Sequence, residues 1–240
     1  MSKASSLRIS PAVREKVDKY TAKLYSEVQE FLSECVPEKI QYLSLVLTCD
    51  YFVVQDPRTL HAELNIPIPD PPSESEESKM ETDKEEKKAP KCGFLKENEN
   101  IRKIINIVIP EIRALREGCA LLITWIHHAI PKIEDGNDFG VSIQEKVLER
   151  ITAIKTKVET TLTNINKYYQ ERGDAVAKAS KETHVMDYRS LVHDKDENAF
   201  VELRLALTEV RNFYIELFDI ICKNFEKLTN PKGEEKSPMY

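Results

Sequence analysis

The chain is poor in glycine, and it lacks a cysteine framework, a basic stripe and a long apolar run. Its 240 residues include 6 glycines, 1 tryptophan and 5 cysteines at irregular spacing. Few glycines leave few places where the backbone can turn sharply. The cysteine spacing excludes a disulfide framework and is typical of a reducing compartment. A net charge of −6 argues against a general nucleic-acid binder, because no basic stripe exists to neutralise phosphates.

Signals for membrane insertion or secretion are missing as well. The most apolar stretch, 119–126, is too short to span a bilayer, and the start of the chain lacks the apolar core of a signal peptide. We therefore expect a soluble cytoplasmic protein, with the nucleus as a second compartment. Because 41% of the residues are hydrophobic, the chain can bury a substantial core, and one domain is the simplest count.

Motifs of catalysis and ligand binding are also lacking. The sequence has no phosphate-binding glycine loop with a following lysine, no Gly-x-Ser-x-Gly, no Cys-x-x-Cys and no His-Glu-x-x-His. A calcium loop starting at Asp135 fails, because Phe139 and Lys146 stand where two of its oxygen ligands are needed. We predict a protein without catalytic residues, cofactor or metal.

What the sequence has is apolar residues at steps of three and four over four long stretches, which is the period of an amphipathic helix. Ser10 and Pro11 form a cap before the first stretch, Pro110 predicts a kink or late start in the second, and the third continues past Gly173 if that glycine is tolerated. The predicted helices span 10–37 with a resumed pattern over 38–47, then 101–130, 143–169 and 191–228. This pattern predicts an all-α fold, an elongated antiparallel four-helix bundle.

A Pro-rich and charged insert, 66–96, separates the first two helices. Its middle, Ser73 to Lys88, has seven acids and four lysines among sixteen residues, too little apolar surface to fold. A solvated, disordered insert is the favoured interpretation, and a charged tether for a partner is the alternative. The helices carry adjacent apolar pairs such as Ile104 with Ile105 and Ile220 with Ile221, which make lateral association with other copies plausible.

Several single residues have both a functional and a structural interpretation. His127 and His128 are candidate metal ligands, but they also suit the C-terminal end of a helix as cations. Cys119 lies two turns from His127 and resembles a thiol and base pair, yet a cysteine in a helix is usually a small buried hydrophobe. Trp125 is expected to be a core or subunit-interface anchor.

The loop 131–140 and the C-terminal segment 230–240 are the two candidate interaction sites. Gly136, Gly140 and Asn137 suit a shaped turn after Pro131, and the loop is rich in acid through Glu134, Asp135 and Asp138. The C-terminal segment is polar and ends on Met239-Tyr240. It is either a frayed tail or a leash whose aromatic end and free carboxylate enter a pocket on a partner.

Several motifs in the chain resemble the 11S proteasome activator (REG) family. They are Lys132 to Val141, Gln144 to Val147, Glu171 to Val176 and Asp187-Tyr188-Arg189. Within the family, Met80 to Lys84, Pro90 to Leu95 and the Met-Tyr ending are similar to the beta type of subunit. The resemblance covers nearly the whole chain and is most specific over 125–189.

The resemblance implies a non-catalytic, ATP-independent activator, whose four-helix subunits form a heptameric ring on the core (20S) proteasome. The family's tail, here Ser237, Pro238, Met239 and Tyr240, is expected to insert between core alpha subunits. Its activation loop, here Glu134, Asp135, Gly136, Asn137, Asp138, Phe139 and Gly140, is expected to open the gate, with Asn137 the best single candidate. An alpha-type activator subunit is the implied partner in a mixed heptamer that produces antigenic peptides. A helical adaptor without gating activity is the alternative.

The chain departs from the family pattern in two places. We expect Arg-Ala-Pro-Leu-Asp in a beta-type subunit, whereas residues 61–65 read His-Ala-Glu-Leu-Asn. The order Ser237-Pro238 also looks swapped, and a proline so near the carboxylate restricts Ser237 and its approach to a pocket. These departures predict a drifted copy of the beta type with weakened docking.

Overall fold

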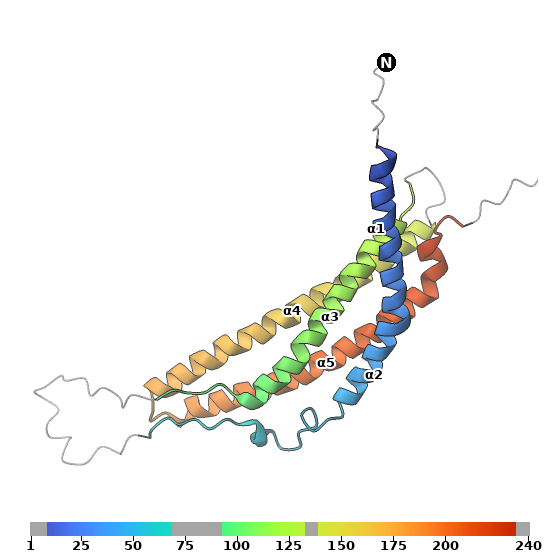
Figure 1. Ribbon diagram of the computed structural model, residues 1–240. Helices are drawn as coiled ribbons and strands as arrows, with labels where there is room; N and C mark the ends of the chain where they lie inside the picture. The colour runs from blue at the N-terminus through green and yellow to red at the C-terminus, as the bar shows by residue number, and fades with distance from the viewer. Residues whose placement is uncertain (1–8, 69–92, 133–138, 234–240) are drawn as a thin grey trace, which may run out of the picture. The chain divides into compact units, whose positions relative to one another are not determined.

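The computed structural model describes residues 9–68, 93–132 and 139–233. The charged stretch Ser73 to Lys88, the loop residues Glu134 to Asp138 and the tail residues Ser237 to Tyr240 lie outside these ranges. The regular secondary structure of the described residues is helical, without a strand. Its elements are α1 (Pro11–Glu30), η1 (Phe31–Cys35), α2 (Val36–Val46), η2 (Pro57–Leu60), α3 (Glu99–Ala129), α4 (Phe139–Lys181) and α5 (Met186–Thr229) (Figure 1). Because α1, η1 and α2 are continuous, the described chain has four long helices, and the all-α four-helix prediction is confirmed. None of the described helices is apolar enough over a sufficient length to cross a membrane.

The first helix begins as predicted and continues without a break through Pro37. Ser10 is the N-cap, its hydroxyl accepts from the Val13 amide at 3.4 Å, and Pro11 follows at the first helical position. The helix runs through Pro37 to Val46, which agrees with a pattern that reaches Pro37 and resumes over 38–47. The five residues before α2 form a π-helical segment, in which the Val36 amide donates to Phe31 O. This wider turn lets the helix continue through Pro37, which has no N–H to donate.

The second predicted helix also starts earlier than its proline suggested. α3 begins at Glu99 and contains Pro110 in its interior, so the late start is wrong. Asn98 caps α3, because its side-chain oxygen accepts from the Asn100 amide at 3.0 Å and the Ile101 amide at 3.2 Å. α3 ends at Ala129, just before Pro131, in agreement with the sequence.

The chain packs into two compact units. Unit 1 comprises Met1–Val46, Glu111–Thr160 and Thr208–Tyr240. Its core includes Val28, Val36, Leu43, Ile112, Leu115, Leu122, Trp125, Ile126, Ile151, Ile154, Tyr214, Leu217 and Ile221. Within it, α4 and α5 run antiparallel, and Arg150 of α4 forms an ion pair with Glu216 of α5.

Unit 2 comprises Leu47–Pro110 and Thr161–Leu207. Its core includes Phe52, Ile101, Ile104, Ile105, Val108, Val192, Leu203 and Leu207. The connection that follows α2 packs here through Phe52, Leu60 and Ile66, each at most 5% exposed. Arg189 of α5 holds the end of this connection, since its guanidinium donates to Ile66 O at 2.8 Å and Pro67 O at 3.1 Å.

Candidate functional site

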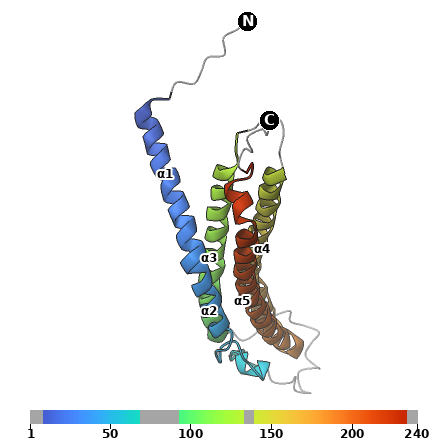
Figure 2. The same ribbon diagram turned by 90° about the vertical axis from the view of Figure 1, so that its right-hand side faces the viewer.

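The predicted loop and the predicted tail join the fold at the same end of unit 1. α3 ends at Ala129, α4 begins at Phe139 and α5 ends at Thr229. Both ribbon views place these three helix ends together (Figures 1 and 2). In the sequence, segment 133–138 lies between the first two ends, and the tail follows the third. Of the predicted site residues, only Phe139 and Gly140 are among those that the structure describes.

The beginning of α4 corrects the boundary predicted for the loop. Phe139 and Gly140 belong to the first turn of α4 rather than to a loop that extends to 140. Phe139 is 71% exposed, whereas Gly140 is buried. The glycine is needed for a close approach and not for a turn, because a Cβ at this position would lie 1.9 Å from Pro231 O and 2.6 Å from Pro231 Cα.

The root of the tail is a defined turn after α5. The Asn230 amide still bonds to Glu226 O at 2.8 Å, and the Gly233 amide bonds to Asn230 O at 3.2 Å. Gly233 has a φ of 69°, which is the left-handed region that glycine adopts at little cost. Pro231 is buried at the start of this turn. α5 ends at Thr229, one residue beyond the predicted end at 228.

One side-chain amide joins all three helix ends. Gln144, in the second turn of α4, is 0% exposed, and its Nε2 donates to Ala129 O at 3.1 Å and Leu228 O at 2.8 Å. Both acceptors are last-turn carbonyls, which lack a partner inside their own helix. Gln144 Oε1 is buried with no hydrogen-bond partner among the described atoms. We call Gly140, Gln144, Ala129, Leu228 and Pro231 the helix-end cluster.

The surroundings of His127, His128 and Cys119 favour a structural role over metal binding or catalysis. His127 and His128 lie exposed in the last turn of α3, where a cation interacts favourably with the helix end. Across the residues that the structure describes, no three His, Cys, Asp or Glu side chains are grouped to hold a metal ion. Cys119 is 0% exposed, and burial raises the pKa of its thiol to about 12, so little thiolate forms at neutral pH.

Trp125 is a core residue of unit 1, which is one of the two roles predicted for it, the other being a subunit-interface anchor. Its ring meets Tyr25 edge-on at a centroid distance of 6.5 Å and stacks on Phe225 at 6.2 Å. It is 2% exposed at the base of an apolar groove of about 780 Å³ between α1, α3 and α5. The residues that line the groove include Phe218 and Cys222 but no Asp, Glu, Lys, Arg or His.

Sequence reasoning missed a buried polar cluster in unit 2, centred on Asp196. This carboxylate is 0% exposed and accepts from Tyr168 Oη at 2.7 Å, Arg172 Nε at 2.8 Å and Asn98 Nδ2 at 2.7 Å. Burial, followed by the hydrogen bond to Asp196, raises the pKa of the Tyr168 phenol. The available signal was an aspartate four residues after Val192 and three before Ala199, on the buried face of α5.

A pair of histidines lies beside this cluster. α5 begins at Met186, so His193 lies in its second turn. Its ring stacks on His61 at a centroid distance of 4.2 Å, and His61 Nε2 lies 2.5 Å from Glu197 Oε1. Burial, together with the nearby His61, lowers the pKa of His193.

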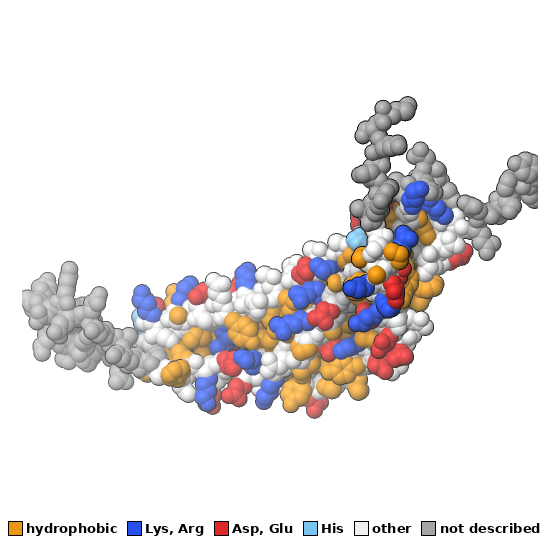
Figure 3. All heavy atoms as spheres, turned by 45° about the horizontal axis from the view of Figure 1, so that its top comes forward, with side chains coloured by type: hydrophobic (Ala, Val, Ile, Leu, Met, Phe, Trp, Pro, Cys, Tyr) orange, Lys and Arg blue, Asp and Glu red, His pale blue; other side chains and the backbone are white. Residues whose placement is uncertain are grey.

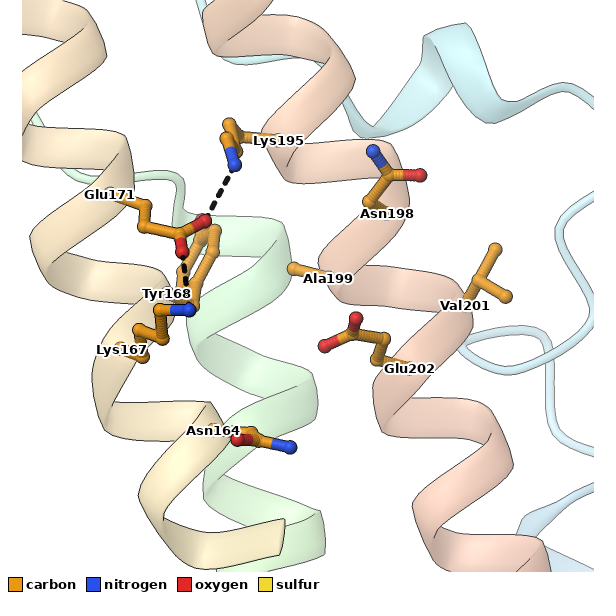
Figure 4. A pocket seen from close by; sticks show the side chains of 9 residues that line it. All are labelled: Asn164, Lys167, Tyr168, Glu171, Lys195, Asn198, Ala199, Val201 and Glu202. Atoms are coloured by element: carbon orange, nitrogen blue, oxygen red, sulfur yellow. Dashed lines mark hydrogen bonds and ion pairs between the residues drawn. The ribbon is translucent and has the colours of Figure 1, made fainter.

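A polar groove of about 470 Å³ lies between α4 and α5 in unit 2 (Figure 4). Glu171 accepts from Lys195 at 2.5 Å and pairs with Lys167 at 3.2 Å, and these ion pairs lower the pKa of its carboxyl group. Figure 4 shows Asn198 and Glu202 on the facing helix. The charges of the groove are largely balanced, and nothing in it pairs a nucleophile with a base.

Comparison with known proteins gives a consistent picture over the whole chain. Residues 94–238 match the family described as Proteasome activator PA28, C-terminal, and residues 11–71 match Proteasome activator PA28, N-terminal. The chain is 57% identical over 241 residues to Proteasome activator complex subunit 2 of Sus scrofa and 56% identical to that of Homo sapiens, in both cases covering 100% of each sequence.

More distant relatives agree. Proteasome activator complex subunit 3 of Homo sapiens is 33% identical over 253 residues, which cover 99% of this chain and 100% of that protein. A solved structure, the 11S subunit of the Plasmodium falciparum proteasome, PA28, superposes with a TM-score of 0.78 over 97% of this chain and 100% of that one. At 22% identity, this last likeness concerns the fold.

Proposed function

The chain belongs to the proteasome activator PA28 family, and we propose on this basis that it is a non-catalytic, ATP-independent activator subunit of the proteasome. Its ring docks on the core particle through the C-terminal tails, Ser237 to Tyr240. The activation loop, Glu134 to Gly140, then opens the gate of the core and enhances peptide hydrolysis and antigenic peptide production. The chain acts in the cytoplasm and the nucleus.

The observation that carries this proposal is that the loop and tail attach to one end of unit 1. A gate opener must hold its partner and push on it at the same face. The tail follows Gly233 and the loop follows Lys132, and Lys232 Nζ lies 3.4 Å from Lys132 O. A single short tail binds weakly, but a ring of tails gains avidity through effective concentration. The helix ends on either side of the loop are packed into unit 1, so they can support a push on the gate.

Ring assembly is supported by apolar side chains that unit 1 leaves at its surface. The adjacent isoleucines whose pattern suggested association are largely buried, so that reasoning pointed to the wrong residues. Instead α1 exposes Val13 (51%), Val17 (54%) and Tyr20 (60%), which recur at helical spacing on one side. Figure 3 shows hydrophobic side chains at the molecular surface among charged ones. We propose that neighbouring subunits, including an alpha-type activator subunit, cover this α1 stripe in a heptamer.

The test is hydrolysis of a short fluorogenic peptide by the latent core proteasome. The chain is added alone and mixed with an alpha-type subunit, and stimulation is expected in at least the mixture. No stimulation in either would defeat the gating proposal and leave the alternative of a helical adaptor. Cleavage by the chain without the core would instead indicate a catalytic activity of its own.

Two variants separate the proposed roles of loop and tail. Asn137→Tyr is expected to keep ring binding to the core and abolish stimulation. Deletion of Met239 and Tyr240 is expected to abolish binding. Co-sedimentation with the core measures binding, and peptide hydrolysis measures gating. Equal activity of both variants would overturn the assignment.

A further inference from the structure

Gly140 and Pro231 bring two functional segments into backbone contact. A Cβ on residue 140 would meet Pro231 O, C and Cα at 1.9, 2.5 and 2.6 Å. These three atoms belong to the backbone of a buried residue, so they cannot move away as the end of a flexible side chain could. The beginning of α4, where the loop ends, therefore rests directly on the first residue beyond α5, where the tail starts.

Gln144 adds a second connection one turn later. Its amide donates to the end of α3 and to the end of α5 from a position on α4. Since the amide is fully buried and its oxygen has no partner among the described atoms, the two donated bonds and the surrounding packing fix its position. Loss of this amide would release both helix ends at once, one leading to the loop and the other to the tail.

We propose that Gly140 and Gln144 are positioning residues that couple the docking tail to the activation loop. They hold the two backbone roots in one fixed arrangement, so that seating the tail in the core places the loop against the gate. This inference rests on the proposed function. Small displacements of a positioned group reduce its effect strongly even when binding is intact. Loosening the cluster therefore lowers the effect of a bound activator more than its binding.

A simple structural role predicts something different. If the helix-end cluster only stabilises unit 1, its variants lower the melting temperature, yet folded molecules bind and stimulate normally. If it couples tail and loop, folded molecules bind the core with nearly normal half-saturation and stimulate poorly at saturation. The separation of maximum effect from half-saturation distinguishes these cases.

The chain offers matched controls in the same helix. Gly173 of α4 has no atom within 4 Å of the position that a Cβ would take, so Gly173→Ala adds the same group without a contact. Gln170 of α4 is exposed, so Gln170→Leu changes the same chemistry away from the helix-end cluster. The test variants are Gly140→Ala and Gln144→Leu. Pro231→Gly is a third variant, used in case Gly140→Ala does not fold. It loosens the backbone where the tail begins and adds no atoms.

The experiment titrates each variant, mixed with an alpha-type subunit, into the latent core and follows fluorogenic peptide hydrolysis. We expect the test variants to reduce maximal stimulation roughly fivefold or more while half-saturation changes by less than about twofold. The controls should match the wild type. Thermal unfolding, followed by circular dichroism, verifies that each variant is folded at the assay temperature.

Each outcome decides between the alternatives. Normal maximal stimulation by folded test variants overturns the coupling, and so does a parallel loss of binding and stimulation. A reduction that the Gly173 and Gln170 controls share overturns it as well. If the wild-type mixture fails to stimulate, the proposed function itself fails and the coupling with it. If the wild type stimulates and only the test variants lose their maximum, the coupling stands.

Discussion

Replacing Asp196 with alanine should destabilise the protein severely. The carboxylate is fully buried and carries the charge that balances Arg172, whose side chain is 9% exposed. Removing one partner of such a pair leaves an uncompensated buried charge, at a cost of about 3–5 kcal/mol. The Tyr168 hydroxyl and the Asn98 amide lose an acceptor too. Since each kcal/mol corresponds to about 2–4 °C for a protein of this size, the melting temperature should fall by roughly 6–20 °C.

Thermal unfolding followed by circular dichroism measures this effect. Asp194→Ala is the matched control, because it removes a carboxylate that is less buried on the same helix. The control should stay within about 0.5 kcal/mol of the wild type. Replacing the pair with apolar residues, as in Arg172→Met with Asp196→Leu, should recover much of the loss, because no buried charge is then left unpaired. Similar melting temperatures for Asp196→Ala and Asp194→Ala would refute this reasoning.

Three shorter predictions follow from the same structure. Gly118→Ala should cost about 1–3 kcal/mol in chemical denaturation, because its Cβ would lie 2.4 Å from the Phe31 ring; an unchanged midpoint would contradict this packing. Cys119, with a pKa of about 12, should stay unlabelled by iodoacetamide at pH 8 while the exposed cysteines react, and mass spectrometry distinguishes them. Because the pKa of His193 is lowered in the fold, the unfolded chain binds more protons below about pH 6.5, so stability should fall as the pH drops below that value. His193→Asn should flatten this part of the melting curve against pH, and an identical pH dependence in the variant would exclude His193 as its source.

The sequence predicted the helices well because their apolar period is long and regular. It failed where a local rule met a tertiary contact. The late start suggested by Pro110 is wrong, because α3 begins at Glu99. A π-helical segment carries the first helix past Pro37, and no local sequence rule predicts it. Gly140 was read as a turn residue, whereas packing against Pro231 explains it. Periodicity identifies the face of a helix, but it does not identify which backbone atoms approach that face.

The hydrogen-bond partners of the buried polar residues could not be predicted from the sequence either. Gln144 and Asp196 are both 0% exposed, and each is bonded to segments far away in the chain. A single sequence gives no spacing rule that connects Gln144 with Leu228 or Asp196 with Asn98. A polar residue on an apolar helix face signals that a partner must exist, because an unpaired buried group is costly. It does not name the partner, and only the fold supplies that.

The two departures that we expect from the family pattern predict different consequences. The first changes residues 61–65, and the structure builds His61 into unit 2 through its stack on His193 and its contact with Glu197. A replacement that gains a ring contact and a carboxylate partner is accommodated locally, so its effect belongs to the stability of unit 2. The second, Ser237-Pro238, lies in the tail beyond the described residues, where the proposed function places docking. If this chain activates poorly, we therefore expect half-saturation of the core to require a higher concentration of the chain. Maximal stimulation, which we propose depends on the helix-end cluster, should be retained.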